Sequence, residues 1–461
     1  MTKIVIIGAG SAIFGLNTLG SLLRSPKLRG SQIALVDLNA QNLERMTRLA
    51  DKINQVWDAG MQITSHLHHQ EALSGADFVV SAVEVPPREK LWRQDFEIPL
   101  KYGVRQPYAE NGGPGGFAHT ARNINPILEI AGDMQQACPN AWYINFTNPM
   151  VRICDAINRY TSIKVVGLCH QIYAGYGMVG YVLADELGIN VPDAPFSTHA
   201  DPKYSPLVHY IAQQTVEKVD IKAAGLNHFT WIVDIRSRLT GEDLYPDLHK
   251  AWKRVNPAVE PLTRQVYEAF GLMPVPGDEH LDEYLPWCSD PQTTPWEKFD
   301  LSLYDWEGAA QQREEGHQRI DRLVTGEEDI DTLKDTTSEG AVEVIEALSL
   351  SFNEYHLAVN LPNIGQINNL PLNAIVETPA LLSGMGVQPV AVGNLPEGIA
   401  ELLRREITVS QLSVDAAVLG DRQLALQALL LDPVITDLNI AKQILEDYLL
   451  TYREYLPQFW N

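Results

Sequence analysis

The chain has 461 residues, of which 45 % are hydrophobic and 20 % are charged, as in an ordinary globular protein. Its 35 basic and 58 acidic side chains give a net charge of -23, which argues against nucleic acid and anionic membranes as partners. No apolar run approaches the ~18 residues of a transmembrane helix, no signal peptide is recognised, and the 4 cysteines lack CxxC spacing, so we predict a reduced, cytoplasmic protein.

A glycine-rich turn follows the first predicted strand, residues 3–7. The turn contains Gly8, Gly10, Ser11, Ala12 and Phe14. Backbone amides at the start of the next helix can bind a pyrophosphate, and the glycines let the phosphates approach closely. Ile13 occupies the position of the third glycine in the GxGxxG pattern, and Gly15 comes two places later. The turn predicts a dinucleotide site. A glycine turn by itself is weak evidence for such a site.

A second predicted strand, residues 32–36, ends at Asp37. A carboxylate at this position can accept hydrogen bonds from the ribose hydroxyls of NAD, and it would repel the 2′-phosphate of NADP. An alternative is that Asp37 caps the helix that starts near Ala40. The glycine turn and Asp37 together favour NAD.

The third predicted strand, residues 77–83, ends at Val83, which we expect beside the cofactor. The loop that follows it leads to Arg88, a candidate substrate contact at the same edge of the sheet. Residues 108–117 form a glycine-rich loop that we predict to be a lid over the cofactor or substrate, and the alternative is a mobile surface loop. Arg122 stands on the helix after this loop and is a second candidate substrate contact.

Two further strand ends carry polar side chains. Asn148 precedes Pro149, which disfavours helical backbone, and its amide can contact a cofactor or a sugar hydroxyl. The strand at residues 163–168 is followed at once by Cys169 and His170, whose side chains suit zinc, iron or nickel. The alternative is a buried free cysteine. Strands alternate with helices up to about residue 190, which predicts a parallel, doubly wound sheet.

Three candidates lie in the second half of the chain. His228 follows Asn227 between apolar strand segments, and we predict that it is the second metal ligand, the alternative being a core histidine. His280 and Tyr284 are spaced i and i+4, which predicts one helix face unless the segment is an exposed acidic helix start. Tyr284 can act as a base only if its pKa of about 10 is lowered by a cation. Residues 310–337 predict a solvated helix and linker.

These motifs resemble glycoside hydrolase family 4, and they occur in the order found in that family. The matching segments are residues 8–14, 113–116, 148–149, 167–170, 225–228, 279–284, 363–371 and 430–433. The resemblance implies an α/β fold, with a Rossmann-type NAD-binding domain over residues 1–195 and a mixed α+β domain over residues 196–461, as in lactate and malate dehydrogenases. It also implies a homodimer or homotetramer with a small carbohydrate as substrate.

The resemblance further implies NAD and a divalent metal, usually Mn2+, as cofactors. NAD would oxidise C3 of the sugar, and the metal, held by Cys169 and His228, would polarise the C2 and C3 oxygens. Tyr284 would remove the C2 proton, the aglycone would leave by elimination, and water addition and re-reduction would follow. His170 after the metal cysteine implies a non-phosphorylated α-hexoside or α-uronide, with His170 as the acid, and His280 is a further candidate substrate contact.

Three alternatives remain open from the sequence. The chain could be an NAD-dependent 2-hydroxyacid dehydrogenase, which needs no cysteine–histidine metal pair. It could apply the same glycosidase chemistry to an anionic sugar such as a sulfosugar. It could also be a non-catalytic NAD sensor, although no basic DNA-binding element is present.

Overall fold

The computed structural model describes residues 2–199, 204–290, 292–301 and 303–460. The strands are β1 (Lys3–Ile7), β2 (Gln32–Val36), β3 (Gln62–His66), β4 (Phe78–Ser81), β5 (Trp142–Asn145), β6 (Lys164–Gly167), β7 (Val219–Leu226), β8 (Phe229–Ser237), β9 (Glu354–Pro362), β10 (Ile375–Ser383) and β11 (Gly386–Pro389). The helices are α1 (Phe14–Arg24), α2 (Ala40–Val56), α3 (His69–Leu73), α4 (Arg88–Leu100), α5 (Gly113–Ala137), α6 (Met150–Tyr160), α7 (Ile172–Val182), α8 (Ala184–Leu187), α9 (Ser205–Val216), α10 (Tyr245–Trp252), α11 (Pro261–Phe270), α12 (Asp278–Leu281), α13 (Pro295–Lys298), α14 (Trp306–Thr325), α15 (Ala341–Leu350), α16 (Glu397–Leu419), α17 (Arg422–Leu431) and α18 (Leu438–Thr451).

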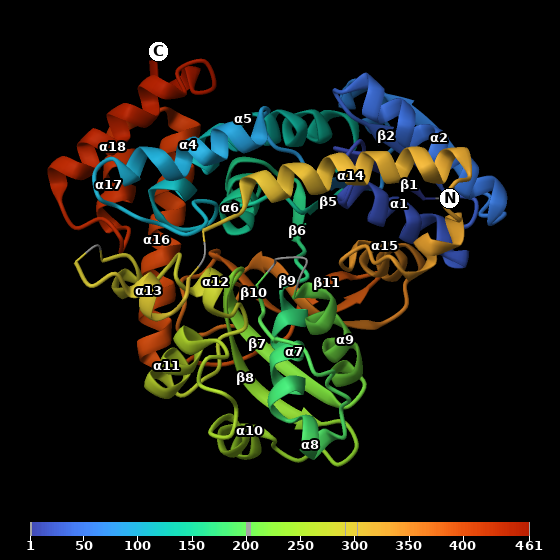
Figure 1. Cartoon of the computed structure of the whole chain (residues 1–461). Helices are drawn as coiled ribbons and strands as arrows, with labels where there is room; N and C mark the ends of the chain where they lie inside the picture. Colours follow the sequence, from blue (N-terminus) through green and yellow to red (C-terminus); the bar gives the residue numbers. More distant parts are fainter. Residues whose placement is uncertain (1, 200–203, 291, 302, 461) are drawn as a thin grey trace.

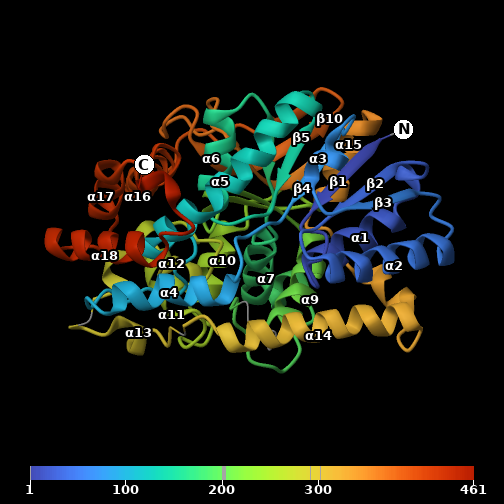
Figure 2. The same ribbon diagram turned by 90° about the horizontal axis from the view of Figure 1, so that it is seen from above.

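The first half of the chain forms the predicted parallel, doubly wound sheet, with strand order β3-β2-β1-β4-β5-β6. Figure 1 labels β1, β2, β5 and β6 of this sheet. Side chains alternate between the two faces of a strand, and both faces of β1 are covered. Ile4 and Ile6 pack with α1 and α2 on one face, whereas Val5 and Ile7 pack with α5 and α6 on the other. Seen from above, the C-terminal helices α16 to α18 lie beyond α5 and α4 (Figure 2).

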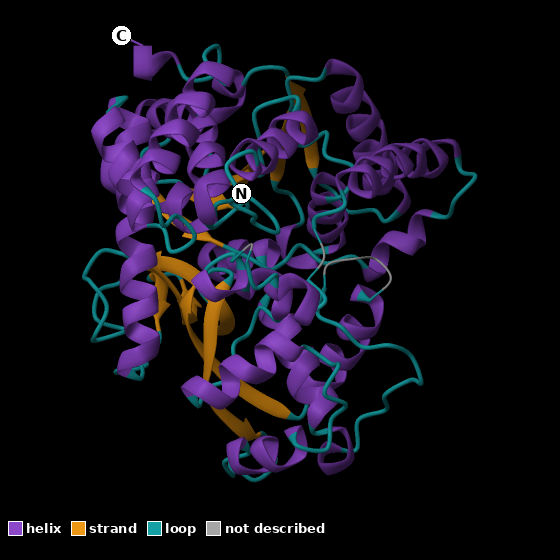
Figure 3. Ribbon diagram, turned by 60° about the vertical axis from the view of Figure 1, so that its left-hand side comes forward, coloured by secondary structure: helices purple, strands orange, loops and turns teal. Residues whose placement is uncertain are grey.

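The strands of the second half extend the same sheet. β9 pairs antiparallel with β6, β10 pairs with β9, and the β7–β8 hairpin follows on β10. Four paired residues form one row across these strands: Gly167 on β6, Asn360 on β9, Glu377 on β10 and Gly225 on β7. The β7–β8 hairpin extends away from the parallel strands of the first half of the chain, which we call the dinucleotide half. Helices cover the sheet in that half (Figures 1 and 3). The predicted domain boundary at residue 195 stays a prediction.

Three local predictions were wrong. The apolar segments on either side of Asn227 and His228 are not parts of one strand, because the chain reverses there to form the β7–β8 hairpin. The glycine-rich segment is not a lid, because residues 108–117 are buried and Gly113 begins α5. His280 and Tyr284 do not share a helix, because α12 ends at Leu281.

Helix α14 fits the prediction of a solvated helix over most of its length. Within the described part of the chain, none of the helices combines the length and apolar character that crossing a bilayer requires.

Candidate active site

The glycine turn between β1 and α1 is built around close backbone contacts. Gly8 has a φ of +84°, which glycine adopts without strain, and its N–H donates to the carbonyl of Val36 (2.9 Å). The N–H of Gly10 donates to Oδ2 of Asp37 (2.9 Å), and a Cβ on Gly10 would lie 2.8 Å from that oxygen. Asp37 therefore braces the turn, while Asn39 is the residue that caps α2. The amides at the start of α1 remain suited to a pyrophosphate.

Gly15 performs the packing role that the third glycine has in the GxGxxG pattern. A Cβ at Gly15 would lie 2.3 Å from the carbonyl oxygen of Ala9, so any larger residue would push the start of α1 away from the glycine turn. Ile13, at the usual position of that glycine, is half exposed (49 %). The irregular spacing thus preserves the close contact between α1 and the turn.

The turn faces the loops that follow β4 and β5. Val83 is linked to Thr147, whose Oγ1 accepts a hydrogen bond from the Val83 N–H (3.0 Å) and donates to the Val83 carbonyl (3.1 Å). The ring of Phe14 packs on Phe146 with centroids 4.7 Å apart. Ser11 accepts a hydrogen bond from the N–H of Phe14 (3.2 Å). These residues line the carboxyl edge of the sheet, where the nicotinamide end of a dinucleotide would lie.

Cys169 and His228 meet although 59 positions separate them in the chain. The Sγ of Cys169 lies 3.5 Å from Nε2 of His228, and the cysteine is partly buried while the histidine is buried. His228 has a φ of +63°, a left-handed conformation uncommon for residues other than glycine. A sulfur and an imidazole nitrogen at this distance could ligate one cation.

A buried carboxylate on β10 holds the hairpin turn in place. Oε2 of Glu377 accepts hydrogen bonds from the side-chain amides of Asn227 and Asn360, each at 2.9 Å. Oε1 accepts a hydrogen bond from the hydroxyl of Thr230 (2.7 Å). Glu377 is 1 % exposed, so these donors compensate for a charge that would be costly to bury alone. The residue that carries His228 is therefore tied to the centre of the sheet.

The electrostatics of the pair suit metal binding. Burial raises the pKa of Cys169 to about 12, with further increases from Glu377 and Glu339, so the thiol is protonated until a cation displaces the proton. Burial and the neighbouring His280 lower the pKa of His228 well below its ordinary value, so its imidazole is neutral and free to act as a ligand.

His280 and Glu283 lie beside His228. The potential ligand atoms of the three residues all lie within 4.8 Å of one another. The ring of His280 packs on that of His228 with centroids 4.1 Å apart, and its Nδ1 is 2.9 Å from Oε1 of Glu283. The structure thus brings His280 next to the predicted metal pair.

Asn111 supports the opposite side of the His228 ring. Its Nδ2 lies 2.9 Å from Nδ1 of His228 and donates to Oε2 of Glu110 (2.9 Å). Oε2 of Glu283 accepts the N–H of Asn111 (3.0 Å), which fixes the backbone that carries this amide. An amide nitrogen can only donate, so in this arrangement Nδ1 of His228 accepts and Nε2 carries the proton. Ligation of a cation by Nε2 would require Asn111 to turn its Oδ1 towards this ring and accept the Nδ1 proton.

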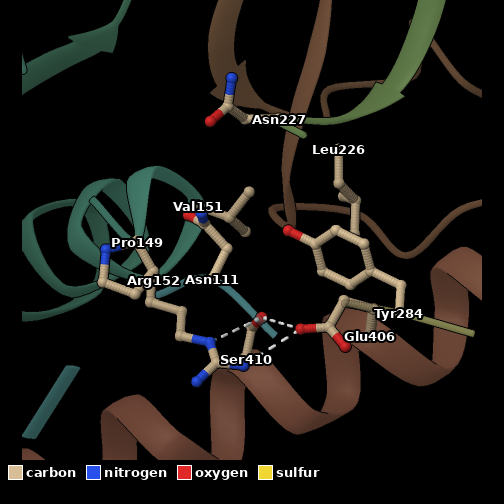
Figure 4. A pocket seen from close by; sticks show the side chains of 9 residues that line it. All are labelled: Asn111, Pro149, Val151, Arg152, Leu226, Asn227, Tyr284, Glu406 and Ser410. Atoms are coloured by element: carbon tan, nitrogen blue, oxygen red, sulfur yellow. Dashed lines mark hydrogen bonds and ion pairs between the residues drawn. The ribbon is translucent and has the colours of Figure 1, made fainter. Parts of the chain in front are cut away.

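Tyr284 directs its hydroxyl into a small pocket (Figure 4). The pocket is lined by Asn111, Pro149, Val151, Arg152, Leu226, Asn227, Tyr284, Glu406 and Ser410. The ring of Tyr284 stacks on Phe229, with centroids 4.7 Å apart and planes inclined by 13°. Burial raises the pKa of Tyr284 well above its ordinary value, and Glu283 and Glu406 raise it further while Arg152 lowers it. The tyrosine is therefore a base only when an additional positive charge is near.

His170 projects outward next to Cys169, with 68 % of its side chain exposed. Its Nδ1 lies 3.1 Å from Oε2 of Glu339, and the charge of that carboxylate raises the pKa of the imidazole. Glu339 thus favours the protonated form of this imidazole, next to the ligand pair.

Two further predicted substrate contacts, Asn148 and Arg88, already have partners within the protein. Asn148 donates through Nδ2 to Oε2 of Glu110 (3.0 Å). Arg88 is paired with Glu84 and lies over the ring of Trp92, 4.8 Å from its centroid.

Arg122 lies away from this group. It is 3 % exposed and forms a bidentate pair with the buried carboxylate of Asp95, with distances of 2.6 and 2.5 Å. Its guanidinium is therefore fully engaged in the core, and we withdraw it as a substrate contact.

Sequence reasoning missed the residues that support the predicted site. These are Glu110, Asn111 and Glu283 around His228, Glu377 beneath the hairpin turn, and Glu339 beside His170. The first three stand within quoted motifs, but their partners are distant in sequence. Glu377 lies in a strand without any flanking motif.

Comparison with known proteins finds matches over nearly the whole chain. The family 4 glycosyl hydrolase model matches residues 3–183, and the model of the family's C-terminal domain matches residues 223–435. An α-glucosidase of Erwinia rhapontici is 30 % identical over 96 % of this chain and 98 % of its own length. An α-galactosidase of Bacillus subtilis is 29 % identical over 100 % of both chains, and an α-galacturonidase of Thermoanaerobacterium saccharolyticum is 29 % identical over 98 % of this chain and 96 % of its own.

Solved structures agree in fold. The Bacillus subtilis protein lplD superposes with a TM-score of 0.82 at 27 % identity, covering 97 % of this chain and 99 % of its own. A 6-phospho-α-glucosidase from gut microorganisms, crystallised with NAD and Mn2+, superposes with a TM-score of 0.80 at 22 % identity over 99 % of both chains. The two family models together cover most of the chain, with Cys169 inside the first match and His228 inside the second; the chain belongs to glycosyl hydrolase family 4.

Proposed function

We propose that this enzyme hydrolyses non-phosphorylated α-glycosides with NAD and a divalent cation, Mn2+ in the first instance, as cofactors. The observation that carries the proposal is the approach of Cys169 Sγ to His228 Nε2, at 3.5 Å, where β6 leaves the dinucleotide-binding sheet. An ordinary dehydrogenase of hydroxy acids has no need for such a pair. Relatives that act on α-glucosides, α-galactosides and α-galacturonides support α-glycosides as the substrate class.

The residues fit both cofactors. The amides of the glycine turn and the carboxylate of Asp37 suit a pyrophosphate and a ribose, and the thiol and neutral imidazole suit a borderline cation. When bound, NAD would take a hydride from the sugar and return it within the same turnover, while the cation would polarise the carbonyl group of the oxidised sugar.

The chain's own side chains would then move protons. We assign to Tyr284 the acceptance of the C2 proton, because its hydroxyl is directed into the pocket between Asn111 and Asn227 (Figure 4). We assign to His170 the donation of a proton to the leaving glycosidic oxygen, because its exposed imidazole is held by Glu339 beside Cys169. Asn148 and His280 are proposed to bind sugar hydroxyls, and Arg88 to contact the substrate at the mouth of the site.

A panel of p-nitrophenyl glycosides tests this proposal. We expect release of p-nitrophenol from an α-hexoside or α-uronide only when NAD and Mn2+ are both present, and loss of activity after treatment with EDTA. β-Glycosides and 6-phosphorylated glycosides serve as matched negative substrates. Undiminished activity after complete removal of NAD would overturn the mechanism, and activity confined to a sulfonated sugar would select the anionic-sugar alternative.

Asn111 offers a second test, of the metal site alone. Asn111→Ala should weaken Mn2+ binding about 10- to 100-fold, because His228 loses the neighbouring amide whose Oδ1 would accept the Nδ1 proton when Nε2 ligates the cation. Asn111→Asp should restore most of the affinity, because a carboxylate can accept the Nδ1 proton. The measurement is a Mn2+ titration followed by electron paramagnetic resonance in the absence of substrate. Equal affinity in the alanine variant and the wild type would contradict this role.

We also propose a cytoplasmic homodimer or homotetramer. The free state of all 4 cysteines fits a reducing compartment. Size-exclusion chromatography with light scattering would establish the assembly.

A further inference from the structure

Helix α14 runs along the edge of the dinucleotide half, across the front of β1 and α1 (Figures 1 and 2). Ion pairs join it to two helices of this half. Arg313 pairs with Glu89 at the start of α4, and Asp321 pairs with Arg45 on α2 (3.2 Å). Between these two contacts, α14 crosses the glycine turn itself. The helix therefore runs from the start of α4, past the glycine turn, to α2.

The central contact is a hydrogen bond to the backbone of the turn. Nε2 of His317 lies 3.2 Å from the carbonyl oxygen of Gly10. A carbonyl oxygen can only accept, so Nε2 must carry the proton and donate it. His317 is thus linked to the residue whose own N–H is held by Asp37.

The helix lies too close to the turn to tolerate a side chain between them. A Cβ on Gly316 would lie 2.9 Å from Cβ of Ala12, nearer than such atoms approach in proteins. Gly316 stands in the interior of α14, where glycine disfavours the helix, so close packing against the turn accounts for it.

The end of α14 is fixed to α2 as well. Nζ of Lys52 donates to the carbonyl oxygens of Leu323 (2.8 Å) and Val324 (3.1 Å). Those carbonyls belong to the last turn of the helix, which has no partners of its own for them. α14 is therefore attached at both ends and at its centre.

We infer that α14 is a clasp over the NAD site and that His317 is a cofactor-retaining residue. The contacts of Gly316 and His317 hold this helix on the glycine turn, and the dinucleotide would leave faster once the helix lifts from it. The inference rests on the proposed function in one respect, that NAD is the cofactor. An enzyme that returns its hydride in every turnover has no need to exchange NAD. Slow release of the cofactor therefore costs it nothing in rate.

Release of NADH from the purified enzyme, without metal or substrate, tests the clasp by stopped-flow protein fluorescence. We expect His317→Ala to release NADH about fivefold faster, the effect of losing one neutral hydrogen bond. Gly316→Ala should accelerate release at least as much, although alanine favours the helix. His317→Gln, whose amide can donate to the same carbonyl, should restore slow release. Gln318→Ala, exposed on the same helix, is the matched control.

The outcomes separate the clasp from the proposed function. Unchanged release in both His317→Ala and Gly316→Ala, with circular dichroism showing a folded protein, would overturn the clasp while leaving the glycosidase intact. Failure of the wild type to bind NADH would overturn both. If Gly316→Ala does not fold, the comparison of His317→Ala with His317→Gln decides alone.

Discussion

Cys169→Ser and His228→Ala are each expected to abolish Mn2+ binding and glycosidase activity while NAD binding stays unchanged. Sγ and Nε2 lie 3.5 Å apart and are the donor atoms that face one another at the carboxyl edge of the sheet. A serine hydroxyl is a harder and less easily ionised ligand than a thiol, so even this conservative change removes the donor. Loss of a direct ligand should exceed the 10- to 100-fold effect typical of its supporting partners.

The measurements are Mn2+ affinity, NAD affinity and kcat for the same preparations. Cys138→Ala is the matched control, because Cys138 is a buried free cysteine at the end of α5 that belongs to the hydrophobic core. It should keep full metal affinity. Wild-type Mn2+ affinity in both ligand variants would show that the cation, if any, is held elsewhere, for instance by His280 and Glu283.

Tyr284→Phe should lower kcat about 10²- to 10⁴-fold, the contribution expected of a positioned general base. The phenyl ring keeps the stacking on Phe229, so only the hydroxyl in the pocket is lost. Because burial raises the pKa of this tyrosine well above its ordinary value, we expect it to act only when the metal site is occupied.

The diagnostic measurement for Tyr284 is exchange at C2 of the sugar in D2O, with NAD and Mn2+ present. The wild type should incorporate deuterium at C2, and Tyr284→Phe should not, although it binds both cofactors normally. Tyr210→Phe is the control, because its hydroxyl is exposed and contacts Asn190. Undiminished exchange in Tyr284→Phe would assign the base to another residue.

The elements that the sequence predicted well are those governed by local rules. Apolar runs of β-branched residues gave the parallel strands, and Cys169 and His228 were identified because each follows such a run. The reversal at Asn227 and His228 was missed because this dipeptide lacks the glycine that marks a two-residue hairpin turn. His228 is held in its left-handed conformation by tertiary contacts and not by local preference.

The supporting residues could not be predicted for a related reason. Glu283 contacts Asn111 across 172 positions, and Glu377 contacts Asn227 across 150, so no spacing pattern records either contact. A carboxylate such as Glu377 in a strand suggests a solvent-facing position until its three donors are known. Helix α14 has a polar sequence, and nothing in it indicates that Gly316 and His317 contact the glycine turn.

The row Gly167–Asn360–Glu377–Gly225 has a consequence for how such enzymes can diverge. The separation between the sulfur and the imidazole is set by hydrogen-bonded strands, not by the chain that connects residues 170 and 218. Insertions or deletions in that connection can therefore accumulate over evolutionary time without moving either donor atom. The cation site can therefore keep its dimensions while the length of that connection changes.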